Sequence, residues 1–384
     1  MDIESITSLK AFKQLGPAWD QLWSASPGAD ILFSYEWFKN WLDLFAAKPR
    51  LLVLVARENQ QTRAILPLMR CWERTHGIAI RVVRSVTNCH SHGFDLVALE
   101  ADPVLFSEMI KKAFRAAHKS LIILDHVSER SLLHRLITGD GHFPYLSHFR
   151  LHSENCQIRL EGSFDEYFNQ RSSRFRKNVR AAERKALERG PLQLVHVNRL
   201  EELKQITKNC YDLEITGWKG RDKEALLQVR QAHDFYFRLA QKWCDEKRLD
   251  VFILKSNDEW MAFYYCINSA GAYRAVRIGI NEAFRNLGPG MLLTKYTLEK
   301  LFAEQSGKVW DFCGGSARWK SDWCNGREKF YRVFIFRDNW LGRVLYHCAR
   351  RLEHFDMLHS PGCPYEIPAT SHAPLPSISG GKHG

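Results

Sequence analysis

The sequence predicts an α/β fold, with a mixed α+β sheet, built from two tandem halves of the same plan. The chain of 384 residues has room for two domains of roughly 100 to 200 residues each. Residues 51–85 and 250–280 both read as three strands separated by polar or glycine-containing turns. After each of these three-strand meanders comes a helix-like segment and then a short apolar strand. This order implies a mixed sheet with helices packed on it.

In the first half, polar turns separate the predicted elements. The three strands, the helix and the closing strand are Leu51–Ala56, Arg63–Cys71, Ile78–Ser85, Val104–His118 and Leu121–Asp125. Another helix comes before the meander, because Tyr35, Phe38, Trp41 and Phe45 fall at helical spacing.

The second half repeats this order at similar spacing. Its elements are Val251–Lys255, Trp260–Asn268, Tyr273–Ile280, Met291–Glu304 and Val309–Phe312. A helix again precedes the meander, with Tyr236, Phe237 and Trp243 on one face. The doubled pattern indicates an ancient duplication, although few identities remain between the halves.

These patterns give the domain organisation. We expect one domain over residues 1–150 and a second over residues 151–355, with the boundary near Ser147–Gly162. Residues 356–384 are rich in Pro, Ser, Gly and His and should form a disordered tail.

Composition limits the function classes. The formal charge of +12 favours an anionic partner, such as a phosphorylated substrate, an acyl carrier protein or an anionic membrane surface. No helix-turn-helix, zinc-finger or RNP-like pattern is visible, so DNA is not an expected partner. The ten scattered cysteines and the absence of a long apolar stretch predict a cytoplasmic protein with reduced, mostly buried thiols. Cys89, His90 and His92 lack a second ligand pair for zinc, so we expect a loop there and no metal.

The strongest local motif is R-x-x-G-x-G at Arg285–Gly290, between the third strand of the second meander and the next helix. Glycines let a backbone approach an anion closely, and amides at a helix start donate to phosphate oxygens. The first half has no such motif, since Thr87–Asp95 occupies the corresponding position. The pattern predicts one phosphate-binding loop per chain.

A meander followed by R-x-x-G-x-G resembles motif A of the GNAT acetyltransferases, in which this loop grips the pyrophosphate of coenzyme A. Further motifs are similar to the CelD/BcsL-like acetyltransferases of cellulose and exopolysaccharide production. In the second half they are Glu214–Gly220 (EITGWKG), the basic helix after Phe164, Asp311 and Lys320–Trp323; in the first half, Trp19–Leu22, Phe33–Trp37 and Leu66–Leu68. The resemblance spans about residues 10–340. It implies two GNAT-like halves, the first degenerate and shaping an acceptor cleft.

The resemblance also implies roles for individual residues. Acetyl-coenzyme A or another acyl-coenzyme A would be the donor, held by Arg285, Leu287, Gly288, Gly290 and Met291. The candidate catalytic residues are Asp311, Glu214 and Lys320, and the candidate acceptor-binding residues are Trp218, Lys219 and Trp323. Each carboxylate could instead be a paired structural group, and each lysine a solvated one. Cys313 has no histidine nearby in sequence, which argues against a covalent nucleophile.

Two basic helices complete the sequence pattern. The segment Arg171–Arg189 places eight Arg and Lys residues around an apolar stripe, which suits either solvent or an anionic donor or acceptor. The segment Leu341–Leu352 suits packing on the sheet or contact with anionic lipid at the inner membrane face.

The sequence therefore predicts transfer of an acyl group from acyl-coenzyme A to an amine or hydroxyl of a sugar- or peptide-like acceptor. Polysaccharide or cell-envelope biosynthesis is the expected setting. Two alternatives stay open: an aminoacyl-tRNA-dependent transferase of the related FemAB type, and a non-catalytic binding protein for anionic envelope precursors.

Overall fold

A single mixed β-sheet runs through the described part of the chain. The computed structural model describes residues 1–27, 29–46, 50–75, 78–118, 120–139, 143–216, 230–305, 307–315, 317–351 and 357–358. Within these ranges the strand order is β1-β2-β3-β4-β6-β13-β7-β12-β11-β10-β9-β8, and β5 and β14 pair with β3. This arrangement confirms the predicted α/β class with a mixed sheet.

The strands are β1 (Asp2–Ile6), β2 (Leu51–Glu58), β3 (Gln61–Thr75), β4 (Ile78–Ser85), β5 (Val97–Ala98), β6 (Leu121–Ser128), β7 (Leu146–Arg159), β8 (Leu192–Val197), β9 (Leu249–Ser256), β10 (Glu259–Ser269), β11 (Ala272–Ile280), β12 (Val309–Asp311), β13 (Gly326–Phe336) and β14 (Met357–Leu358). The α-helices are α1 (Leu9–Gln14), α2 (Gly16–Ala25), α3 (Tyr35–Phe45), α4 (Pro103–Ala117), α5 (Leu132–Thr138), α6 (Phe164–Asn169), α7 (Ser173–Arg189), α8 (Leu200–Thr216), α10 (Arg230–Trp243), α11 (Pro289–Glu304), α12 (Arg318–Trp323) and α13 (Trp340–Arg351). Two short 3₁₀ helices are η1 (Ile31–Phe33) and η3 (Glu282–Leu287).

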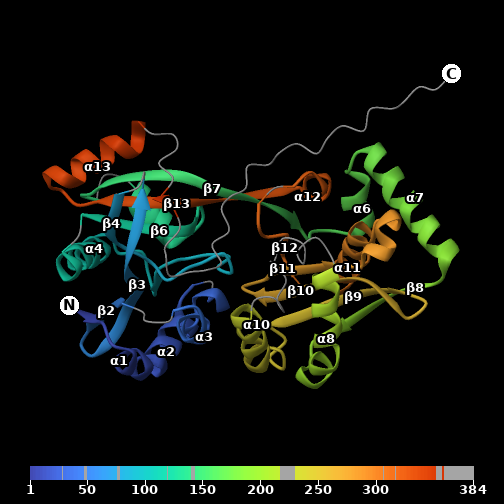
Figure 1. Cartoon of the computed structure of the whole chain (residues 1–384), viewed down its shortest axis with the longest axis horizontal. Helices are drawn as coiled ribbons and strands as arrows, with labels where there is room; N and C mark the ends of the chain where they lie inside the picture. The colour runs from blue at the N-terminus through green and yellow to red at the C-terminus, as the bar shows by residue number, and fades with distance from the viewer. Residues whose placement is uncertain are drawn as a thin grey trace.

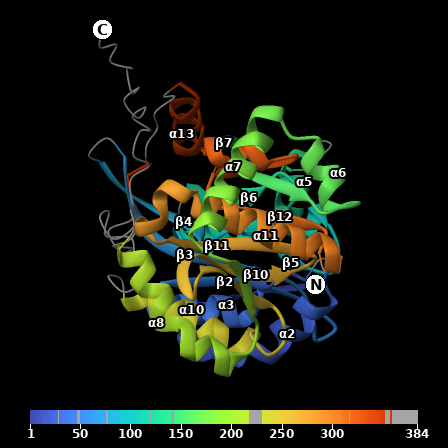
Figure 2. The ribbon, with the colours of Figure 1, turned by 90° about the vertical axis from the view of Figure 1, so that its right-hand side faces the viewer.

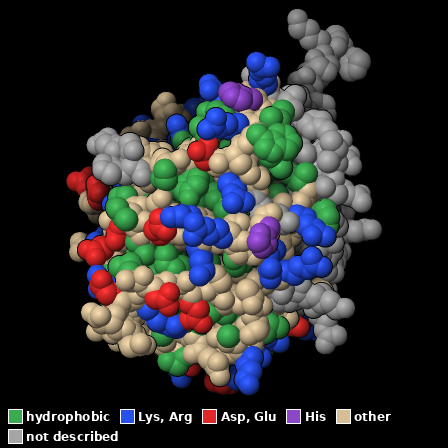
Figure 3. All heavy atoms as spheres, turned by 90° about the vertical axis from the view of Figure 1, so that its left-hand side faces the viewer, with side chains coloured by type: hydrophobic (Ala, Val, Ile, Leu, Met, Phe, Trp, Pro, Cys, Tyr) green, Lys and Arg blue, Asp and Glu red, His purple; other side chains and the backbone are tan. Residues whose placement is uncertain are grey.

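Helices cover both faces of the sheet. In Figures 1 and 2, α2, α3, α8 and α10 form a layer below the sheet, and α6, α7 and α13 lie above it. Figure 3 looks onto the first half and shows basic side chains spread from the top of that surface to its middle. Among the described helices, none combines the length and the hydropathy needed to cross a bilayer.

The two halves exchange their last strands. The last strand of the first half, β7, pairs with β12 of the second half through Ile158–Trp310 and its neighbours. The last strand of the second half, β13, pairs with β6 of the first half through Phe334–Ile123 and its neighbours. Since β7 and β13 also pair with each other along their length, each half completes the sheet of the other.

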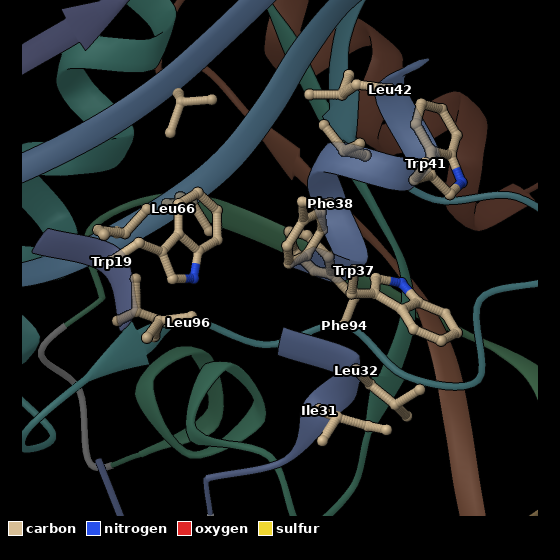
Figure 4. Packing of buried hydrophobic residues seen from close by; sticks show 14 of the residues in the cluster. Trp19, Ile31, Leu32, Trp37, Phe38, Trp41, Leu42, Leu66, Phe94 and Leu96 are labelled. Atoms are coloured by element: carbon tan, nitrogen blue, oxygen red, sulfur yellow. The ribbon is translucent and has the colours of Figure 1, made fainter. Parts of the chain in front are cut away.

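A shared hydrophobic core joins the halves below the sheet. Trp37 and Phe45 of α3 pack against Phe235 of α10, with ring centroids 5.0 and 5.2 Å apart. Trp23 of α2 lies 6.0 Å from Trp243 of α10. Figure 4 shows the first-half part of this core, where several large aromatic side chains pack together with aliphatic ones.

Most of the predicted helices and strands are present in the structure. Both meanders, the helices around them and the closing strands are present, with ends shifted by a few residues. The segment Ser147–Gly162, interpreted as a boundary, is mostly the long strand β7, so residue 150 falls inside a strand. The described cysteines are all free thiols and five of the nine are buried, as predicted. Of the predicted tail, Met357 and Leu358 pair with β3, and residues 356 and 359–384 lie outside the described part.

Candidate active site

In the second half, the pairing between two parallel strands stops partway along the longer one. Pairing between β11 and β12 begins at Ala272–Val309 and ends at Arg274–Asp311. The strand β11 then continues for six residues to Ile280, whereas β12 has ended. Beyond Arg274 and Asp311, β11 has no strand partner on this side among the described residues. We call this interval the opening, and the R-x-x-G-x-G loop follows the far end of β11.

The corresponding place in the first half is closed. There the parallel pairs between β4 and β6 lie at the end of β4, at Val83–Ile122 and Arg84–Ile123. Beyond them the chain fills the gap itself, because the Asp125 amide donates to Ser85 Oγ at 2.9 Å and the Phe94 amide donates to the His126 carbonyl at 3.0 Å. No such bond across the β11–β12 interval is present among the described residues of the second half.

The R-x-x-G-x-G loop forms η3 and then the start of α11. Gly288 adopts a left-handed conformation with φ of 66°, and Pro289 occupies the first turn of α11. The Gly288 amide donates to the Arg285 carbonyl at 3.3 Å, and the Met291 amide donates to the Gly288 carbonyl at 3.0 Å. The Gly290 amide has no acceptor among the described residues and remains available for an anion.

Basic side chains surround this loop. Arg285 is 77% exposed and pairs with Glu282 at 3.4 Å. Lys185 Nζ of α7 donates to the Asn286 carbonyl at 3.5 Å, and the Arg189 guanidinium lies 4.3 Å from the Phe284 ring. A polyanionic donor would thus meet a helix start flanked by cations.

A row of polar side chains crosses the sheet at the apex of the opening. Arg274, Asp311 and Gln157 are register partners on β11, β12 and β7, so their side chains share one face. Asp311 is buried; its Oδ1 accepts from the Cys313 amide at 2.7 Å and its Oδ2 from Gln157 Nε2 at 3.1 Å. Gln157 Nε2 also donates to Glu328 at 2.6 Å. Asp311 is therefore fixed at the apex by bonds to both of its oxygens.

Lys320 closes the turn after β12. Its Nζ donates to the carbonyls of Cys313 at 2.5 Å and of Gly315 at 3.2 Å. Burial lowers the pKa of Lys320, and the nearby Cys313 and Asp311 partly offset this effect. Burial also raises the pKa of the Cys313 thiol, which keeps it protonated and agrees with the prediction that it is not a nucleophile.

Residues of the first half reach the same place. Asp30, just before η1, forms an ion pair of 2.5 Å with Arg274 Nη2. His92, in the loop after β4, is partly exposed as a residue, but its Nε2 is buried without a hydrogen-bond partner among the described residues. Burial, together with the charges of Arg274, Arg277 and Lys320, lowers the pKa of His92 to about 3. A neutral imidazole from one half thus faces three cations from the other.

The remaining predicted residues have different positions. Leu287 is a core side chain, while Gly288, Gly290 and Met291 lie at the α11 start. Trp323 is also buried, with its ring 4.8 Å from that of Phe175, so it packs under α7 and presents no surface to an acceptor. Glu214 belongs to the last turns of α8, and Trp218 and Lys219 lie outside the described residues. The roles proposed for these residues stay predictions.

The sequence did not single out Asp30, Arg274 or His92 as site residues. His92 stood in the Cys/His stretch that was interpreted as a loop, which it is. Arg274 could have been found from the alternation of β11, in which it stands between the apolar residues Tyr273 and Ala275, both buried. Nothing local to Asp30 or His92 indicates a partner in the other half.

The comparisons with known proteins agree with this geometry. A family model described as an acetyltransferase (GNAT) domain matches residues 173–321, which include the opening, the loop and Lys320. A sequence comparison with curated proteins found no match. FemX has a similar structure, with a TM-score of 0.56 and 12% identity over 92% of this chain and 100% of its own. The C-terminal domain of a protein assigned as a lysylphosphatidylglycerol synthetase from Agrobacterium fabrum gives a TM-score of 0.51 and 11% identity over 88% and 96%.

The structural likenesses show a shared fold, since the identities are low. The match of residues 173–321 lies in the half that contains the R-x-x-G-x-G loop, and the first half repeats the same order of elements. The chain therefore contains a GNAT acetyltransferase domain, and the protein is an acyltransferase of the GNAT type.

Proposed function

We propose that the protein moves an acetyl or longer acyl group from acyl-coenzyme A to an amine or hydroxyl of a sugar- or peptide-like acceptor. The observation that carries this proposal is that β11 runs on past the end of β12 for six residues and leads into the R-x-x-G-x-G helix start. The pyrophosphate would lie at the Gly290 amide and near Arg285, and the pantetheine arm would follow β11 toward Arg274 and Asp311.

The acceptor would bind where the halves meet, at the apex of the opening. Its nucleophile attacks the thioester carbonyl, the carbon–sulfur bond breaks, and the coenzyme A thiolate leaves and takes up the proton lost by the nucleophile. Of the three predicted catalytic residues, Asp311 and Lys320 lie at this apex. Lys320 would favour the negative charge that develops on the thioester carbonyl oxygen, and Asp311 the positive charge that develops on the nucleophile. Glu214 stays an additional candidate base.

A second donor has specific support. The fold is similar to that of FemX, and the sequence resemblance relates this chain to FemAB transferases. An aminoacyl-tRNA would then replace acyl-coenzyme A, with its acyl group delivered to the same apex. The acyl-coenzyme A proposal has four further parts. They are membership of the CelD/BcsL-like group, a polysaccharide or envelope pathway, a carrier-protein partner and a cytoplasmic location.

The test is a thermal-shift titration with acetyl-coenzyme A. Saturating donor should raise the melting temperature by a few degrees, because a ligand at 100 times its Kd stabilises the native state by about 2.7 kcal/mol. Arg285→Ala should remove most of this shift.

Arg199→Ala is the matched control. Arg199 is 74% exposed and pairs with Glu202 three residues away at 3.8 Å, much as Arg285 pairs with Glu282, but it lies at the start of α8. It should leave the shift unchanged. If acetyl-coenzyme A has no effect while labelled amino acid is transferred from charged tRNA, the second donor is correct. Tight ligand binding without turnover, unaffected by Arg285→Ala, would contradict both.

A further inference from the structure

The helix α13 carries an unusual outward face. Trp340, Leu341 and Val344 in its first turns are 77%, 39% and 49% exposed. The opposite side of the helix packs on the sheet, where Leu345, Tyr346 and Ala349 contact a cluster that includes Phe334 and Phe336 of β13. The exposed apolar side chains are therefore additional to those that dock the helix.

The same outward face is basic. Between Trp340 and Arg351 the helix has three arginines and no acidic residue. Asp338, just before it, pairs with Arg343 at 2.9 Å, with both side chains more than 60% exposed. Arg350 and Arg351 are exposed at the other end. Toward the top of the view in Figure 3, hydrophobic, basic and histidine side chains lie together, and most of the acidic side chains lie lower down.

The neighbouring strand extends this surface. Leu146 of β7 is 37% exposed, and α13 packs along this strand. His148 and Arg150 stand at alternate positions after Leu146 on β7, so the three side chains share one face of the strand. After burial, the charges of Arg350 and Arg150 are the main causes of the lowered pKa of His148. Apolar and cationic side chains from both elements thus face the same side.

We propose that the α13 surface, formed by Trp340, Leu341, Val344, Arg350 and Arg351, docks on an anionic phospholipid bilayer. Tryptophan suits the headgroup boundary, where its ring is half apolar and half wet, and arginines beside it attract anionic lipid. Three apolar side chains on the first turns of one helix are too few for the roughly 800 Å² per partner that a stable protein interface buries. The docking would bring the acyltransferase to a membrane surface, whichever donor it uses.

The test is co-sedimentation of the full chain with vesicles of phosphatidylcholine alone or with about one third phosphatidylglycerol. The protein should bind the anionic vesicles and release them at high salt, and should not bind phosphatidylcholine alone. Arg350→Gln combined with Arg351→Gln should weaken binding about 25-fold, since each arginine near an anionic surface contributes about fivefold. Trp340→Ser combined with Val344→Ser should weaken it at least about tenfold.

Val104→Ser is the matched control, because Val104 is 72% exposed at the start of α4 and should not affect binding. All the substituted side chains are exposed, so unchanged melting temperatures verify folding. Arg285→Ala should bind vesicles like the wild type, which separates this proposal from the donor site. Equal binding by wild type and Trp340→Ser/Val344→Ser, or no preference for anionic vesicles, would overturn the proposal. The proposal would also be overturned if the wild type were a dimer and Trp340→Ser/Val344→Ser were a monomer, because the α13 surface would then bind a second copy of the chain.

Discussion

Single side chains link the two halves at the centre of the molecule. The pair between Asp30 and Arg274 crosses from one half to the other and lies where the pairing of β11 with β12 ends. Arg274 also has one buried nitrogen, Nη1, without a partner among the described residues. Breaking a buried pair leaves an uncompensated charge, which costs far more than the pair itself contributes. Asp30 is therefore expected to hold both the interface and the orientation of Arg274.

Asp30→Asn should lower the free energy of unfolding by about 3 kcal/mol, the low end for a broken buried pair, because the Arg274 side chain keeps 17% exposure. Asp43→Asn is the matched control, since Asp43 and Arg238 form another pair between the halves, at 3.8 Å and on the surface. It should cost less than about 1 kcal/mol. Denaturant unfolding measures both values. Equal effects of the two variants would show that the Asp30 pair is not buried in solution.

The site residues differ in how far the sequence could predict them. Asp311 and Lys320 could be found because they stand in motifs next to an apolar strand, and both lie at the apex. Trp323 stands in the same motif, yet its ring is in the core, because spacing alone does not tell which face of a short helix is buried. His92 and Asp30 could not be found, since the residues that face them lie about 180 or more positions away.

Among the elements, the strands of the meanders were predictable and the joining strand was not. Alternation and turn residues mark β2 to β4 and β9 to β11 locally. In contrast, β7 is rich in polar and basic residues and is stabilised by its ladder with β13, in which paired residues lie 169 to 190 positions apart along the chain. Such a strand forms because of tertiary pairing, and its own propensity is weak.

The start of α11 gives a prediction at this scale. Gly288→Ala should reduce affinity for acetyl-coenzyme A at least about tenfold, because the left-handed conformation disfavours a side chain by about 1–2 kcal/mol and the loop would shift. Its new Cβ would lie 3.3 Å from Met291 Cε. Gly271→Ala is the control with φ of 76° in a turn near β12. Calorimetric titration should show normal affinity for Gly271→Ala, and equal losses in both variants would mean that the loop does not contact the donor.

At the scale of the whole molecule, the exchange of β7 and β13 makes the two halves one structural unit. The first half depends on β13 of the second half and the second half depends on β7 of the first, and α3 and α10 share a core below the sheet. Neither half can lose its partner without exposing a sheet edge and a large apolar surface.

The described chain should therefore unfold in one cooperative transition. Scanning calorimetry should give a single peak whose calorimetric and van't Hoff enthalpies agree. Two resolved peaks, each removed by a different destabilising substitution, would show that the halves unfold independently despite the exchanged strands.

The central claim is that a duplicated fold keeps one donor site, in the second half. The most direct test is calorimetric titration of the wild-type chain with acetyl-coenzyme A, which measures stoichiometry and affinity together. The account predicts one molecule bound per chain, with binding abolished by Gly288→Ala combined with Arg285→Ala. Two sites per chain, or one site that survives this double substitution, would contradict it.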